Sequence, residues 1–101
     1  MKIIAVNIGK TYQNNLPIID CAKRAWDLDI NIAKGYEYLV AVVNGEIIET
    51  FEIKKVMQDV IEPKKVAFDL VSLQNIQTDE QIRSFIASNN VNLKGIITKY
   101  I

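Results

Sequence analysis

The chain has 101 residues, half of them apolar, with 12 cationic and 12 anionic side chains and no histidine. The length predicts a single domain over residues 1–101, and the zero net charge argues against a generally basic surface for nucleic acid. The missing histidine removes the commonest general base and metal ligand, and a lone cysteine excludes an internal disulfide.

Charged residues are placed unevenly along the chain. Residues 1–35 hold five cations and three anions, whereas residues 36–53 hold four glutamates and no cation. In a short chain this bias could arise by chance, or it could indicate a basic surface beside an acidic one. No apolar run reaches the ~18 residues that a membrane helix needs, and the N-terminus lacks a signal-peptide layout. We therefore expect a cytoplasmic protein without a membrane segment.

The first third of the chain predicts a strand followed by helical segments. Lys2–Ile8 is apolar and rich in β-branched residues, which predicts a strand, and the polar segment Gly9–Asn15 predicts a loop. A helix is expected to begin with Asn15 as its cap and to end near Trp26. A short helical turn is expected over Asp29–Gly35.

The strongest local signal is a β-hairpin in the middle of the chain. Two β-rich runs, Tyr36–Val43 and Glu46–Ile53, flank the dipeptide Asn44-Gly45. Asn-Gly favours a two-residue type I′ turn, because both central residues need a positive φ. Such a turn fixes the pairing of the strands, so that one face of the hairpin holds four facing pairs. These pairs are Val42 with Ile47, Val40 with Glu49, Tyr38 with Phe51, and Tyr36 with Ile53.

Glu49 is the exception on this otherwise apolar face. A β-bulge could turn its side chain out of the face. Alternatively, it could lie near a sheet edge and reach water, or line a pocket and bind a ligand. The sequence leaves these three explanations open.

The C-terminal half predicts two more strands and a second long helix. Val66–Leu73 and Gly95–Tyr100 have the composition of strands, and Lys54–Ile61 fits a short helix or an irregular crossover. A capping-box pattern at Thr78 begins a helix that is expected to end at Asn89. Its apolar face consists of Ile82, Phe85 and Ile86.

The order of these segments indicates the fold class. Strands and helices do not alternate regularly, which favours an α+β fold over a parallel α/β fold. We expect two main helices on a mixed or antiparallel sheet that is strongly curled or closes into a small barrel.

Catalytic chemistry has little support in the sequence. Carboxylates would be the remaining route, but the Asp27 and Asp29 pair suits a turn and the Asp79 carboxylate suits the first turn of a helix. Cys21 lies in a partly apolar stretch and is expected to be a small buried side chain. We therefore expect a protein that is not an enzyme and that uses no cofactor or metal.

Aromatic and cationic side chains gather near the predicted first helix. Arg24 and Trp26 lie at its end, and Lys10 and Tyr12 lie in the loop that precedes it. Planar side chains beside cations can stack on a nucleobase while the cations contact phosphate. The alternative reading is that Trp26 belongs to the core and that the cations are only solvated.

The same residues carry a resemblance to a known group of domains. A strand ending in Asn7 is followed by a helix ending in Arg24-Ala25-Trp26 and then by a hydrophobic strand with a Gly-led return strand, residues 38–51. In this layout the chain resembles the small bacterial and phage-associated PUA-like domains, the group that includes EVE and ASCH domains. The resemblance covers Ile3–Ile53, about half of the chain.

The resemblance implies a curled sheet or pseudo-barrel that recognises RNA, single-stranded DNA or a modified nucleobase. In this first hypothesis, Trp26 would stack on the base and Arg24 and Lys10 would contact phosphate. Asn7 or Glu49 would offer polar contacts to the base edge. The resulting candidate site consists of Asn7, Lys10, Tyr12, Arg24, Trp26 and Glu49.

A second hypothesis is a protein-interaction or regulatory domain, of the kind that mobile elements encode to act on a host partner. The acidic side of the hairpin would then be the contact surface. Its residues are Glu37, Glu46 and Glu52.

Overall fold

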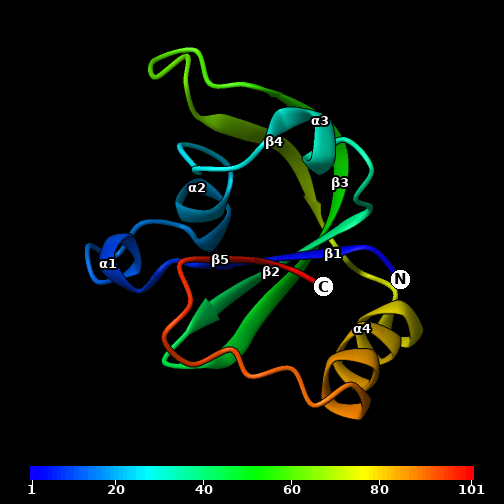
Figure 1. The fold of residues 1–101 in the computed structure, drawn as a ribbon. Coiled ribbons are helices and arrows are strands. Elements are labelled where there is room, and N and C mark those ends of the chain that lie inside the picture. Colours follow the sequence, from blue (N-terminus) through cyan, green and yellow to red (C-terminus); the bar gives the residue numbers. More distant parts are fainter.

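The computed structural model describes all residues 1–101 and has helices on both faces of a mixed β-sheet (Figure 1). The strands are β1 (Ile3–Asn7), β2 (Tyr38–Val43), β3 (Glu46–Gln58), β4 (Val66–Ser72) and β5 (Thr98–Tyr100). The helices are α1 (Gly9–Tyr12), α2 (Ile18–Ala22), α3 (Ile30–Ala33) and α4 (Ile76–Ser88). The strand order is β4-β3-β2-β1-β5, in which β1 and β2 are parallel and all other neighbours are antiparallel. The α+β class is therefore confirmed.

The sheet is open, so the expectation of a strongly curled sheet or barrel is wrong. A barrel would require β4 to pair with β5. Part of the free edge of β4 is instead covered by the segment after α2, because Trp26 and Val66 exchange two backbone hydrogen bonds and the Phe68 amide donates to the Lys23 carbonyl. The other edge strand, β5, has only three residues.

One main helix is present rather than two. The helix expected from Asn15 to Trp26 is reduced to the five residues of α2, because the backbone at both of its expected ends leaves the helical region. Asn15 has φ 58° and Ala25 has φ 68°, which are left-handed values. The segment expected to be a loop after β1 contains the short helix α1.

The central hairpin is confirmed, with a change of register. Asn44 and Gly45 have φ values of 52° and 80°, as a type I′ turn requires. Val42 pairs with Ile47 as expected, but a β-bulge follows, and the remaining pairs are shifted by one residue. These pairs are Ala41 with Glu49, Val40 with Thr50, Leu39 with Phe51, and Tyr38 with Glu52.

Strand β3 is much longer than the hairpin pattern indicates. Residues 54–58 continue the strand, so the expected short helix or crossover over Lys54–Ile61 is wrong. A second irregularity in the register lies between Ile53 and Lys55, and the pairing with β4 resumes beyond it up to Gln58 opposite Val66. The strand alternation is broken at this point, and this concealed the continuation in the sequence.

The core consists of two apolar layers, one on each face of the sheet. The larger layer packs α2 and α3 against one face and includes Cys21, Ala22 and Ala33. The smaller layer packs α4 against the other face through Ile82 and Ile86. Burial of Cys21 agrees with its expected role as a small apolar side chain. Of the four helices, not one is both long enough and apolar enough to cross a lipid bilayer.

Helix α4 begins three residues earlier than its capping-box pattern predicts. Asn75 is the N-cap, and its side-chain oxygen accepts hydrogen bonds from the backbone amides of Gln77 and Thr78. Thr78 therefore lies within the first turn. The predicted end at Asn89 is confirmed.

Candidate functional site

A cavity of about 320 Å³ lies where α1, α2 and the segment before β5 meet, and we call it the Trp26 cavity. Four of the six candidate residues line it, so the structure brings together side chains from β1, α1 and the turn after α2. Known small-molecule sites have volumes of about 300–1,000 Å³ and mostly apolar walls with a few polar groups. The candidate residues in the lining are Asn7, Lys10, Arg24 and Trp26.

Trp26 is anchored by its backbone and by its indole. Its amide and carbonyl are both bonded to Val66, and its Nε1 donates to the carbonyl oxygen of Ala22 at 2.8 Å. The side chain is half-buried and packs against the larger core layer while it also lines the cavity. Trp26 therefore contacts the core and also contributes to the wall of the cavity.

The Asn7 side chain connects the end of β1 to the start of α1 and to the segment before β5 by hydrogen bonds. Its Oδ1 accepts from the Gly9 amide at 2.9 Å, and its Nδ2 donates to the Ile96 carbonyl at 3.0 Å. A carboxamide can donate two hydrogen bonds and accept two, so half of its capacity is left for a ligand. Ile96, which accepts this hydrogen bond, and Ile97 contribute apolar side chains to the lining of the cavity.

Arg24 is engaged in a bidentate ion pair with Asp59. Its Nε donates to Asp59 Oδ1 at 3.0 Å and its Nη2 donates to Oδ2 at 2.8 Å. The Asp59 side chain is only 3% exposed, whereas that of Arg24 is 36% exposed. These hydrogen bonds lower the pKa of Asp59 to about 2 and raise that of Arg24. Arg24 therefore holds the β3–β4 loop in place, and its removal would leave a buried carboxylate without its partner.

Lys10 is the free cation of the cavity. It is exposed, and it lies within ion-pair distance of no carboxylate. Ala25, also in the lining, has the left-handed φ noted above, which costs a non-glycine residue roughly 1–2 kcal/mol. Such strain is concentrated at functional sites in proteins, so its position beside Trp26 and Arg24 supports a role for this turn.

Two candidate residues lie outside the Trp26 cavity. Tyr12, at the end of α1, is 40% exposed and is not part of the lining. Glu49 lies on β3 in a separate groove of about 280 Å³ that shares no residue with the cavity. Tyr12 lies only two residues from Lys10 in the sequence, but positions two apart on a helix point in different directions.

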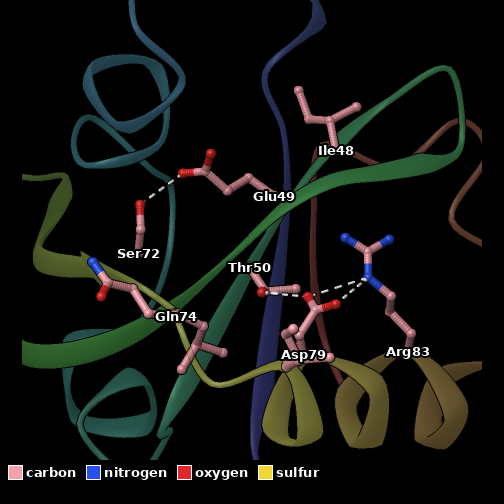
Figure 2. A pocket seen from close by; sticks show the side chains of 9 residues that line it. Ile48, Glu49, Thr50, Ser72, Gln74, Asp79 and Arg83 are labelled. Carbon is pink, nitrogen blue, oxygen red and sulfur yellow. Dashed lines mark hydrogen bonds and ion pairs between the residues drawn. The ribbon is translucent and has the colours of Figure 1, made fainter.

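The groove around Glu49 is shown in Figure 2, and side chains in its lining connect β3 to α4 by hydrogen bonds. Thr50 donates a 2.6 Å hydrogen bond to Asp79, which also accepts from Arg83, and both donors lower the pKa of Asp79. Figure 2 shows Glu49 extending away from this group toward Ser72, whose hydroxyl donates to it at 2.9 Å.

The bulge explains why Glu49 is absent from the expected apolar face. Because Ile48 is the extra residue, Glu49 pairs with Ala41 instead of Val40, and its side chain moves to the other face of the sheet. Thr50 takes the place opposite Val40 and is buried. Of the three explanations for Glu49, the bulge is present, and the residue also lines a groove.

Comparisons of the chain with family models, with curated proteins and with solved structures find no match. The resemblance to PUA-like domains therefore stays a prediction. Sequence reasoning missed Asp59, Ile96 and Ile97, which carry no local signal because the chain brings them to the site from 33 or more residues beyond Trp26.

Proposed function

We propose that the protein binds single-stranded nucleic acid, with one base held in the Trp26 cavity against the indole. The observation that supports this most is the convergence of Asn7, Lys10, Arg24 and Trp26 on one apolar cavity with a single unpaired cation at its edge. Stacking of a base on an aromatic side chain contributes about 1–3 kcal/mol and tolerates every base, because all bases have a π-face. No catalytic step is part of the proposal.

The resemblance to PUA-like domains supports the same ligand class. Asn7 and the Arg24-Ala25-Trp26 segment, which carry the resemblance, all line the cavity. The size of the cavity, at the lower end of ligand sites, suits one base, including a modified one, better than a larger ligand.

In this proposal, Lys10 contacts the backbone phosphate. Arg24 has a buried carboxylate as its partner, so its guanidinium positions the loop and contributes only its exposed part to a ligand. The substitution that tests phosphate contact without disturbing the fold is therefore Lys10→Gln rather than a change at Arg24.

The test uses Trp26 as its own reporter, since it is the only tryptophan of the chain. Short single-stranded DNA and RNA should change its fluorescence at low salt. Lys10→Gln should weaken the binding and lower the slope of log K against log salt by about 0.7, the value for one phosphate on a single strand.

Lys99→Gln is the matched control. Lys99 pairs with Ala5, which belongs to the core layer under α4, so its side chain lies on the face of the sheet away from the cavity. Binding by Lys99→Gln should equal that of the wild type. If neither DNA nor RNA changes the Trp26 signal or the anisotropy of a labelled strand, the proposed function is wrong.

The acidic hairpin surface stays a prediction. Glu46 lies beside the turn, and Glu52 lies six residues further along β3, where it pairs with Lys54 at 3.1 Å. At about 3.3 Å per residue, the backbones of these two residues are separated by roughly 20 Å along the strand. Glu37 lies near Glu52, because the Ile53 amide donates to the Glu37 carbonyl, so Glu46 is the residue set apart from the other two.

A further inference from the structure

A polar recess of about 420 Å³ adjoins the Trp26 cavity, and we call it the Lys94 recess. The two hollows share Asn7 and Lys10, but their walls differ in chemistry. The cavity is walled largely by apolar side chains, whereas the recess has no apolar residue in its lining. Two lysines and three glycines are prominent in it, namely Lys10, Lys94, Gly9, Gly45 and Gly95.

Three distant parts of the chain build this recess. The parallel strands β1 and β2 end beside each other, and the Ile8 amide donates to the Val42 carbonyl at 3.0 Å. The hairpin turn therefore lies next to the segment that leaves β1. Asn7 connects the third part, because its side chain and its backbone amide both donate to carbonyls of the segment that leads into β5.

Gly45 determines where Lys94 lies. A Cβ at position 45 would come within 2.5 Å of Lys94 Cγ, so only glycine lets the lysine stem cross the turn at this distance. Gly45 also has a φ of 80°, which favours glycine independently. The Lys94 amide is held in turn by Asn92 Oδ1 at 3.0 Å. The Lys94 stem therefore lies against the hairpin turn, and Lys94 lines the recess together with Lys10.

The charges of the recess are unbalanced. Its lining includes no carboxylate, and neither Lys10 nor Lys94 belongs to an ion pair. Two unpaired ammonium groups beside a glycine-rich wall leave room and charge for a compact anion, and phosphate accepts several hydrogen bonds from lysine at once. The neutral net charge of the chain makes this local excess informative, because the molecule as a whole does not attract anions.

We propose that the Lys94 recess is the phosphate subsite of the nucleotide whose base occupies the Trp26 cavity. The inference rests on the proposed function and adds a requirement to it, namely that the bound unit is a phosphorylated nucleotide rather than a free base or nucleoside. Lys10 lies at the boundary and contacts the phosphate from the base side, and Lys94 contacts it from the hairpin side.

The experiment compares nucleosides with their 5′- and 3′-monophosphates in titrations followed by Trp26 fluorescence. One charge-assisted hydrogen bond changes affinity by roughly tenfold or more, so at least one monophosphate should bind about tenfold more tightly than its nucleoside. Lys94→Gln should reduce this preference, because only Lys10 then contacts the phosphate, and should leave nucleoside affinity unchanged. Lys99→Gln should retain it.

The outcomes separate the two proposals. If nucleosides and monophosphates bind equally, or if Lys94→Gln keeps the preference, the phosphate subsite is wrong while base binding at Trp26 stands. If nucleosides, monophosphates and single strands all leave the fluorescence unchanged, both proposals fail. A phosphate preference that is reduced in Lys94→Gln but kept in Lys99→Gln supports the subsite.

Discussion

At the scale of single residues, the Arg24–Asp59 pair connects the candidate site to the rest of the fold. Asp59 accepts from the Arg24 guanidinium and from the Glu62 amide at 2.8 Å, so its carboxylate organises the loop between β3 and β4. This loop in turn precedes Val66, to which the Trp26 backbone is bonded. The geometry of the cavity thus depends on a carboxylate that does not line it.

The pH dependence of stability should reveal this pair. The pKa of Asp59 is lowered from 3.8 to about 2 in the folded protein, mainly by its hydrogen bonds from Arg24. A lowered pKa means that the unfolded chain binds the proton first as the pH falls. The contribution of Asp59 is therefore complete above about pH 4 and is lost as the pH falls toward about 2. Thermal unfolding followed by circular dichroism should show the midpoint falling across this window.

Substitution at Asp59 isolates its share of this effect. Asp59→Asn should be less stable than the wild type near neutral pH and should have a flatter midpoint curve between about pH 4 and 2. Some slope should persist, because the pKa of Asp79 is lowered as well. Asp69→Asn, which removes an exposed carboxylate without an ion pair, serves as the control. An Asp59→Asn curve parallel to that of the wild type would contradict the role of the pair.

At the scale of elements, local signals predicted the structure wherever short-range contacts determine it. The Asn44-Gly45 turn needs only its own backbone conformation, and the apolar face of α4 needs only helical spacing. The bulge at Ile48 and the continuation of β3 past Lys54 depend on pairing with β2 and β4, which the local sequence does not show. Ala25 has a positive φ shortly after the end of α2, and because the residue is not a glycine, the sequence does not signal this conformation.

The start of α4 is a direct test of structure against sequence pattern. Asn75 satisfies two backbone amides as the N-cap, so Asn75→Ala should cost about 1 kcal/mol of the free energy of unfolding. Thr78→Ala should have a much smaller effect, because its side chain caps nothing. Urea unfolding of both variants measures the difference. A larger loss for Thr78→Ala than for Asn75→Ala would restore the capping-box prediction.

The candidate site was predictable to the extent that its residues lie close together in the chain. Arg24 and Trp26 are two residues apart, and Lys10 follows the first strand at the end marked by Asn7. Lys94 and Ile96 reach the same place only through the pairing of β5 with β1. Because the pairing of β1 with β5 joins the two ends of the chain, the Lys94 recess could not be predicted from the local sequence.

At the scale of the whole molecule, the open sheet separates two faces that are covered by different helices. One face carries α2, α3 and the Trp26 cavity, and the other is closed by α4 (Figure 1). The cavity and the Lys94 recess lie together at the end of the sheet where β1 and β2 terminate. A ligand that occupies both hollows would contact the crossover after β1, the hairpin turn and the segment before β5 at once.

The most direct measurement is a ¹H–¹⁵N NMR titration of the protein with a short single-stranded oligonucleotide. The one indole N–H of the chain belongs to Trp26 and reports the cavity without ambiguity. We predict shifts of this signal and of the backbone amides of Lys10, Ala25 and Gly45, with those of α4 unchanged. Shifts confined to the glutamates of the hairpin or to the groove at Glu49, or no shift at saturating ligand, would contradict nucleic-acid binding at Trp26.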